Sequence, residues 1–175
     1  ERFIDKLHGA VAPEKPRKDF KDGVYLKLVR NYLRYRWLVI YLLGCSPALH
    51  QSYVPECVRQ LEAVGDDAYV LKTGTSFRNS VYGYKNKIFL FPSYRTVKEY
   101  TEDVQSLVDK GLISAPKELY AQIRMKAKGV DNILESLEED GIKYLEIRTV
   151  DLNVFDKCGI AEKDLVFLHQ FMLYL

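Results

Sequence analysis

The chain has 175 residues, 47% hydrophobic and 29% charged, a balance typical of a globular domain that excludes wholesale disorder. Its formal net charge of +2 gives no strong field to attract nucleic acid or an anionic membrane. Cys45, Cys57 and Cys158 form neither a disulfide framework nor a zinc motif. No basic-then-apolar leader opens the chain, so we expect a cytoplasmic protein with reduced thiols.

The first stretch, 1–22, is predicted to be a loop or a cut edge, because Pro13, Pro16 and many charges do not build a core. A long helix is predicted at about 23–43, with Asp22 as N-cap and Gly44 just after its end. Its C-terminal half should be buried, because the run 37–43 is apolar all round but too short to span a bilayer.

Two faces of this helix carry different side chains. The spacing predicts a core face, made of Leu26, Val29, Leu33, Trp37 and Ile40. Lys27, Arg30 and Arg34 form a basic stripe on the other side, which would suit either phosphates or plain solvent.

The next part of the chain is predicted to hold a short helix at about 54–63 and then a polar loop at 73–87. The loop is punctuated by glycines and embeds Arg78, Tyr82, Tyr84 and Lys85. Loops of this composition often carry binding groups, although a plain surface loop fits the composition equally well.

Two stretches in the second half alternate in the way of half-buried strands. In 118–126, Leu119 and Ile123 face one side, whereas Tyr120 and Arg124 face the other. In 144–148 the polar side is Tyr144, Glu146 and Arg148. Helices are expected at about 97–110, ending at Gly111, at 130–139, closing at Gly141, and at 162–175, the last after a turn-rich segment, 151–159.

If the two strands are neighbours, their polar sides form one charged floor beneath loops. Arginines bind carboxylate or phosphate in a bidentate manner, and a lone carboxylate such as Glu146 suits a hard cation such as Mg²⁺. These groups together favour phosphoryl transfer, which depends mainly on electrostatics. The alternative is a cross-strand ion pair between Glu146 and Arg124 on a solvated face.

No Walker A, dinucleotide-binding or His-Glu-x-x-His motif occurs, and the three histidines are scattered. A module that binds nucleotide or other anions without catalysis remains an alternative function. Nucleic-acid binding through the basic stripe is disfavoured by the small net charge.

Four ordered stretches resemble the bacterial glutamate–cysteine ligases (γ-glutamylcysteine synthetases), particularly the type fused to a glutathione synthetase module. They are YLKLVRNYLRYRW at 25–37 with GCSP at 44–47, TSFRNSVYGYKNK at 75–87, LYAQIR at 119–124 and YLEIRTVDLN at 144–153. The similarity runs over nearly the whole chain from Gly23 onward.

This resemblance implies an α+β fold, part of a glutamine-synthetase-like and mostly antiparallel catalytic sheet with packed helices. It also implies a reaction, the first step of glutathione biosynthesis. ATP phosphorylates the γ-carboxylate of glutamate, and the amine of cysteine then displaces phosphate from the acyl phosphate. ATP is a substrate of this reaction, and Mg²⁺ (or Mn²⁺) is the cofactor.

The resemblance also implies roles for individual residues. Glu146 would be a metal ligand, and Arg148 would be catalytic, steadying the transferred phosphoryl group. The amino-acid substrates would lie among Arg78, Tyr84, Tyr120 and, as an anion-binding group, Arg124.

Further metal ligands of the family lie in a Glu-x-Glu arrangement near its N-terminus, and no such motif precedes Glu1. We therefore expect 1–175 to be a single partial domain, an internal piece of the ligase domain that is incomplete as a catalyst alone. Its partners would be glutamate, cysteine, ATP, a fused glutathione synthetase module and further copies of the chain, with no nucleic acid and no membrane.

Overall fold

The computed structural model describes residues 2–53, 61–83, 85–86, 88–129 and 132–175. The chain divides into two compact units. The first consists of Glu1–Leu33 and Asn86–Arg148, and the second of Arg34–Lys85 and Thr149–Leu175. The expectation of a single partial domain stays a prediction.

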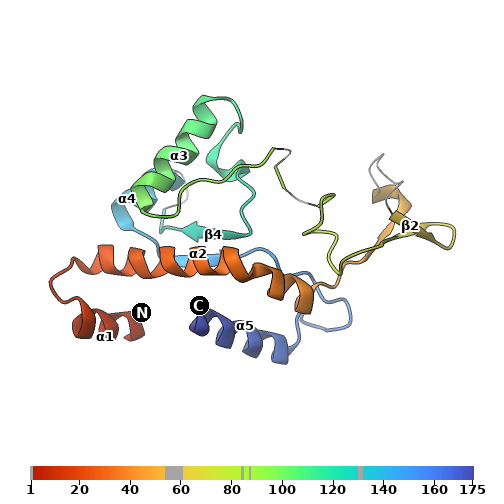
Figure 1. Cartoon of the computed structure of the whole chain (residues 1–175), viewed down its shortest axis with the longest axis horizontal. Coiled ribbons are helices and arrows are strands. Elements are labelled where there is room, and N and C mark those ends of the chain that lie inside the picture. The colour runs from red at the N-terminus through yellow and green to blue at the C-terminus, as the bar shows by residue number, and fades with distance from the viewer. Residues whose placement is uncertain (1, 54–60, 84, 87, 130–131) are drawn as a thin grey trace. The chain divides into compact units, whose positions relative to one another are not determined.

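Helices and one pair of strands build the first unit (Figure 1). Thr96 and Asn132 cap two of the helices, since each side-chain oxygen accepts the backbone N–H three residues on. The elements of the first unit are α1 (Arg2–Val11), the first part of α2 (Arg17–Leu43), α3 (Val97–Asp109), the 3₁₀ turn η3 (Pro116–Glu118), β4 (Ile123–Lys126), α4 (Ile133–Asp140) and β5 (Tyr144–Ile147).

The apolar sides of these elements make the core of the first unit. Val29 in α2, Leu137 in α4 and Ile142 before β5 are completely buried, and α3 packs against both α4 and η3. Ile123 and Met125 of β4 are each only 1% exposed. The predicted inward face of the 118–126 stretch is therefore confirmed, and its polar side is left available for chemistry.

Two antiparallel sheets are described, one in each unit. In the first unit β4 pairs with β5, so that Arg124 lies opposite Glu146 and Lys126 opposite Tyr144. The second unit contains a sheet in the order β1-β3-β2, which the sequence did not predict. Its strands are β1 (Ala48–His50), β2 (Leu61–Val64) and β3 (Ala68–Leu71), and the 3₁₀ turn η1 (Gln51–Tyr53) follows β1.

The second unit also contains the end of α2 and α5 (Glu162–Tyr174). The helix predicted at about 54–63 is wrong from residue 61 onward, where β2 begins, and 54–60 lie outside the described residues. The predicted helix at 162–175 and the turn-rich 151–159 are confirmed.

The loop predicted for 1–22 is wrong. It contains α1 and the first turns of α2, because Pro13 and Pro16 fall only in the short connection between the two helices. Asp22 is consequently not an N-cap. It lies inside α2, only 5% exposed.

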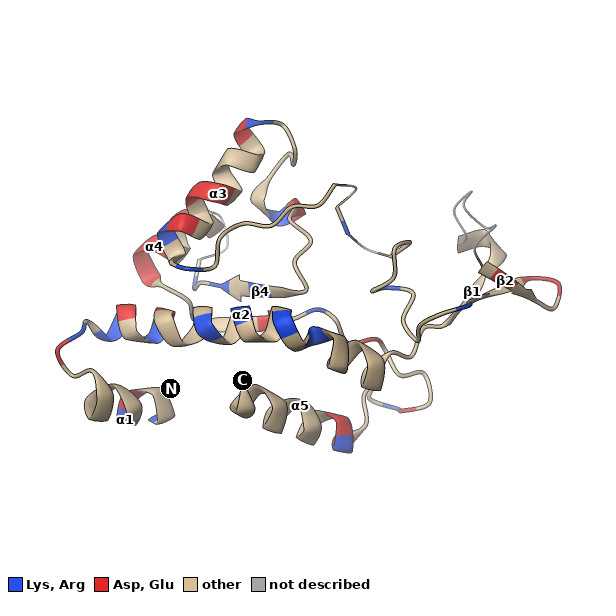
Figure 2. Cartoon of the chain, viewed as in Figure 1, with Lys and Arg blue, Asp and Glu red and all other residues tan. Residues whose placement is uncertain are grey.

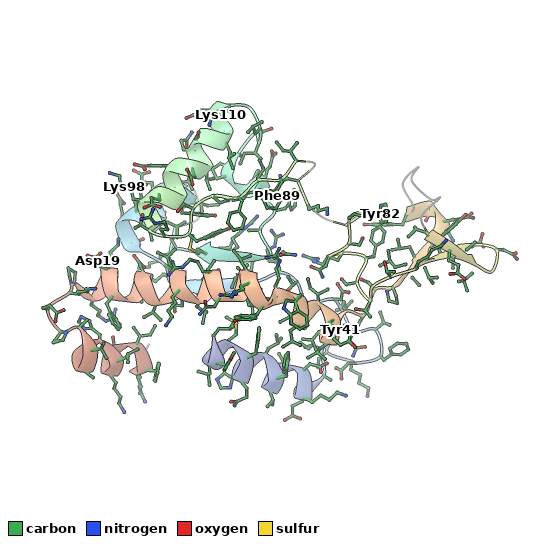
Figure 3. All side chains as sticks on the ribbon, in the orientation of Figure 1. Asp19, Tyr41, Tyr82, Phe89, Lys98 and Lys110 are labelled. Carbon is green, nitrogen blue, oxygen red and sulfur yellow. The ribbon has the colours of Figure 1, made fainter. Side chains whose placement is uncertain are left out.

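The end of α2 at Leu43 is confirmed, but the predicted burial of its C-terminal half is wrong. Trp37 is 61% exposed and Tyr41 is 70% exposed, and Figure 3 shows Tyr41 toward the end of this helix. The buried residues of that half are instead Val39 and Leu43.

Candidate functional site

The polar side of the β4–β5 pair carries a compact cluster of charge. Glu146 is central, because its Oε1 lies 3.3 Å from Arg148 Nε and its Oε2 lies 3.4 Å from Lys126 Nζ. All three side chains are partly shielded, with 38% of Glu146, 24% of Arg148 and 27% of Lys126 exposed. The carboxylate therefore faces one cation on each oxygen.

Strand geometry explains how these groups meet. Glu146 and Arg148 are two residues apart, and therefore point to the same side. The backbone N–H of Arg148 donates to the carbonyl of Gln122 at 2.9 Å, which continues the pairing past the last residue of β5. Lys126 reaches Glu146 diagonally across the strands, within range of a long side chain.

Arg124 lies directly opposite Glu146 but does not form the cross-strand ion pair that was one alternative for this face. Its Nη2 donates instead to the carbonyls of Lys117 and Leu119, at 2.9 and 3.0 Å. The guanidinium thus holds the backbone that leads into β4. Lys126 takes the place expected for Arg124. It lies two residues after Arg124 in β4 and therefore on the same face of the strand.

Tyr100, from α3, is the buried titratable group near this arginine. Burial raises the pKa of the Tyr100 phenol to about 12, and the charge of Arg124 opposes that rise. The phenol is therefore neutral at any physiological pH.

Figure 2 shows how charge is distributed over the helices of the same unit. Acidic residues gather on α3 and α4, whereas Lys and Arg recur along α2. Lys27 and Arg30, which belong to the predicted basic stripe, are both exposed, and Arg30 Nη1 donates to the carbonyl of Tyr94 at 2.6 Å.

Tyr120 stands at the start of the segment that leads into β4, with 41% of the residue exposed. Its backbone N–H donates to Asn86 Oδ1 at 2.9 Å, and Asn86 Nδ2 donates to the carbonyl of Glu118 at 2.8 Å. The structure thus brings Tyr120, Arg124, Glu146 and Arg148 into one unit. Asn86 is an addition that residue patterns alone did not indicate.

Arg78 belongs to the second unit, in an exposed position on the polar loop. The loop is fixed by side chains around it. Asn79 Nδ2 donates to Ser76 Oγ and to the carbonyl of Thr149, both at 2.8 Å. A parallel bridge joins Ser46 to Ser76. Tyr84, the remaining predicted substrate-binding residue, lies outside the described residues.

The carboxylate of Asp151 also helps to hold the loop that carries Arg78. Asp151 is 6% exposed, and its Oδ2 accepts hydrogen bonds from Ser46 Oγ at 2.6 Å and from the backbone N–H of Cys45 at 3.0 Å. Ser46 Oγ in turn accepts the N–H of Phe77 at 3.0 Å. The loop around Arg78 is therefore anchored through the buried Asp151 and the half-buried Ser46.

The described residues do not complete a metal site. Nowhere among them do three or more His, Cys, Asp or Glu side chains come together as a metal ion requires. Glu146 can offer one carboxylate, so the Mg²⁺ implied by the resemblance does not fit as an ion held by these residues alone.

Among the residues that the structure describes, no helix is long and apolar enough to cross a membrane.

Comparison with known proteins agrees with this architecture. The family model described as glutamate–cysteine ligase matches residues 1–111 and 91–175. A glutamate–cysteine ligase from Francisella tularensis, solved in complex with AMP, covers 98% of the chain with a TM-score of 0.83 at 23% identity. A bifunctional glutathione synthetase from Pasteurella multocida covers 99% with a TM-score of 0.77 at 32% identity.

The chain thus has a mixed α+β fold with antiparallel sheets, as the resemblance implied. The chain belongs to the glutamate–cysteine ligase family.

Sequence relatives point the same way. The glutathione biosynthesis bifunctional protein GshAB of Clostridium perfringens is 44% identical over 174 residues, and that of Enterococcus faecalis is 39% identical over 175. The match covers 99% and 100% of this chain but only 22% of either relative. The chain therefore spans about a fifth of the length of the curated relatives it matches.

Proposed function

We propose that the native protein carrying this chain makes γ-glutamylcysteine from L-glutamate and L-cysteine at the expense of ATP. Membership of the family supports this function, as do relatives named for glutathione biosynthesis. The single observation that carries it is the Glu146 carboxylate held between Arg148 and Lys126.

The charge of that cluster suits a phosphoryl group. Three cations, Arg124, Lys126 and Arg148, share the polar side of the strand pair with one carboxylate, which leaves an excess of two positive charges on this side. Such an excess attracts the oxygens of ATP and of an acyl phosphate. Arg148 is the catalytic residue in this proposal, donating hydrogen bonds to the phosphoryl group as negative charge builds on it.

The reaction proceeds in two steps. The γ-carboxylate of glutamate attacks the γ-phosphorus of ATP, which breaks the bond to the ADP oxygen and forms γ-glutamyl phosphate. The amine of cysteine then attacks the acyl carbon, phosphate leaves, and the amine loses a proton. Catalysis of this kind requires positioning and charge compensation more than covalent chemistry by the protein.

We assign binding of the amino-acid substrates to four of the residues that the resemblance named. Tyr120 and Arg124 contribute from the first unit, with Arg124 binding an anionic group, and Arg78 and Tyr84 come from the polar loop. Glu146 would give Mg²⁺ (or Mn²⁺) one carboxylate ligand.

The wider biology follows from the relatives. Their bifunctional names support a glutathione synthetase module in the same polypeptide, and the AMP in the Francisella structure supports a nucleotide as substrate. We also propose a cytoplasmic location and self-association of the ligase.

An assay of phosphate release by the native protein tests the function. ATP, Mg²⁺, glutamate and cysteine together should give steady release of phosphate with equimolar γ-glutamylcysteine, and omission of either amino acid should abolish the dipeptide. Phosphate release without dipeptide would indicate a simple ATPase and would contradict the proposal.

The second candidate is a module that binds anions without catalysis. The excess of cations around Glu146 favours it, because such a surface needs no chemistry to hold a nucleotide. The two candidates differ in what they require of Glu146: the ligase needs its negative charge, and the anion-binding module is weakened by it.

A further inference from the structure

The backbone just before β4 is held by side chains from two directions. Asn86 uses both ends of its amide, donating from Nδ2 to the carbonyl of Glu118 at 2.8 Å and accepting the N–H of Tyr120 at Oδ1 at 2.9 Å. The two contacts bracket Leu119, a residue that is only 4% exposed. Asn86 therefore pairs with this segment much as a neighbouring strand would.

Arg124 holds the same segment through two further carbonyls. Its Nη2 donates to the carbonyls of Lys117 and Leu119, which Asn86 does not contact. Three successive carbonyls and the following N–H are thus all bound by side chains. A backbone fixed in this way has little freedom left to move the residue at its end, which is Tyr120.

The chemistry of the Asn86 contact is specific to a side-chain amide. An aspartate offers acceptors only, so it could bind the N–H of Tyr120 but would repel the carbonyl of Glu118. Alanine would satisfy neither group. Asn86 lies near the end of the polar loop at 73–87, yet it belongs to the first unit, together with Tyr120.

We propose that Asn86 is a positioning residue of the ligase: its amide fixes the backbone beneath Tyr120 and so sets where the Tyr120 side chain meets an amino-acid substrate. This inference rests on the proposed function. Tyr120 touches the substrate, and Asn86 acts through Tyr120 alone.

Steady-state kinetics of the native protein test this role. Asn86→Ala should raise the KM for the same amino acid that Tyr120→Ala affects, about tenfold, while kcat falls by about threefold at most. Asn86→Asp keeps the acceptor and should fall between Asn86→Ala and the wild type. The matched control is Gln105→Ala, which removes an exposed amide bonded to Asp109 on α3 and should change neither constant.

The double variant separates positioning from general damage to the fold. If Asn86 acts through Tyr120, adding Asn86→Ala to Tyr120→Ala should change kcat/KM by less than about twofold, because the two losses share one contact. Losses that multiply would overturn the proposal. An equal rise of the KM for ATP and both amino acids would overturn it as well.

Amide hydrogen exchange provides a readout that does not depend on turnover. The Tyr120 N–H loses its acceptor in Asn86→Ala, and it should exchange about tenfold faster or more, with α3 unchanged. Unchanged exchange at Tyr120 would overturn the proposal.

Failure of this inference can be told apart from failure of the proposed function. A wild-type protein with no ligase turnover would overturn the proposed function itself. An active wild type whose kinetics the Asn86→Ala variant reproduces would overturn only the role of Asn86.

Discussion

The carboxylate of Asp22, in the second turn of α2, accepts the backbone N–H of Ile142 at 2.7 Å, and this bond joins the long helix to the residues that lead into β5. Asp22 is 5% exposed and Ile142 is fully buried. Lys18, one turn earlier in α2, lies 3.6 Å from the other carboxylate oxygen. The contact thereby holds the strand that carries Glu146.

Loss of this carboxylate should destabilise the protein. Asp22→Ala leaves the buried N–H of Ile142 without its acceptor, so we expect the free energy of unfolding to fall by about 1–3 kcal/mol. Chemical denaturation of the native protein, followed by circular dichroism, measures the change. Asp19→Ala is the control, since Asp19 is exposed in the same helix and its removal should cost less than about 0.5 kcal/mol (Figure 3).

Gly141 is constrained by the same carboxylate. Its φ of 71° disfavours any side chain, and a Cβ at this position would lie 2.7 Å from both carboxylate oxygens of Asp22. Gly141→Ala should therefore cost more than Gly111→Ala, where φ is 67° and nothing lies within 4 Å of the added atom. The backbone term alone is about 1–2 kcal/mol, so equal losses in thermal unfolding of the two variants would show that the contact with Asp22 does not matter.

Ionisation of Tyr100 should lower the free energy of unfolding at alkaline pH. Its pKa of about 12 in the folded state exceeds the value of about 10 expected when unfolded, so the folded state holds the proton more tightly. The resulting stabilisation is complete below about pH 10 and is lost as the pH rises toward 12. Two pKa units correspond to about 3 kcal/mol.

Comparison with Tyr100→Phe measures this effect. The variant should lack one late phenolate transition near pH 12 in the ultraviolet titration, and its unfolding free energy should decline less between pH 10 and 12. A titration identical to that of the wild type would contradict the buried, neutral phenol.

Lys126 should matter to the reaction as one of the two cations on Glu146. Lys126→Gln removes a positive charge 3.4 Å from the carboxylate, and we expect kcat/KM for ATP in the ligase assay to fall about tenfold. The fall should be smaller at high ionic strength, where the attraction is screened. Lys128→Gln, at an exposed position two residues on, should leave kcat/KM unchanged.

The strand pair at the site could be predicted because its signal is local. Alternation over 118–126 and 144–148 placed Ile123 inside and Glu146 on the polar side, and both placements are confirmed. Gly111 and Gly141 marked helix ends correctly, since each adopts a positive φ that other residues avoid.

Other features depended on contacts that a pattern does not contain. The sequences of β1, β2 and β3 (ALH, LEAV and AYVL) do not alternate regularly between apolar and polar side chains, so no period of two marks them as strands. Prolines made 1–22 resemble a loop, although they fall only in the connection between α1 and α2. The hydrogen-bond partners of Arg124 could not be predicted from the sequence either. They are the backbone carbonyls of Lys117 and Leu119, which the turn at η3 brings to the guanidinium.

Substitution of Glu146 tests the proposed site most directly. In the native protein Glu146→Gln keeps the shape of the side chain and removes the charge that Arg148 and Lys126 face. A ligase that needs this carboxylate should lose most of its formation of γ-glutamylcysteine, by about 100-fold or more. Glu102→Gln, at an exposed position on α3, should stay near wild-type activity. Unchanged turnover in Glu146→Gln, or a variant that binds ATP more tightly and still forms dipeptide, would contradict the assignment of this strand to the catalytic centre.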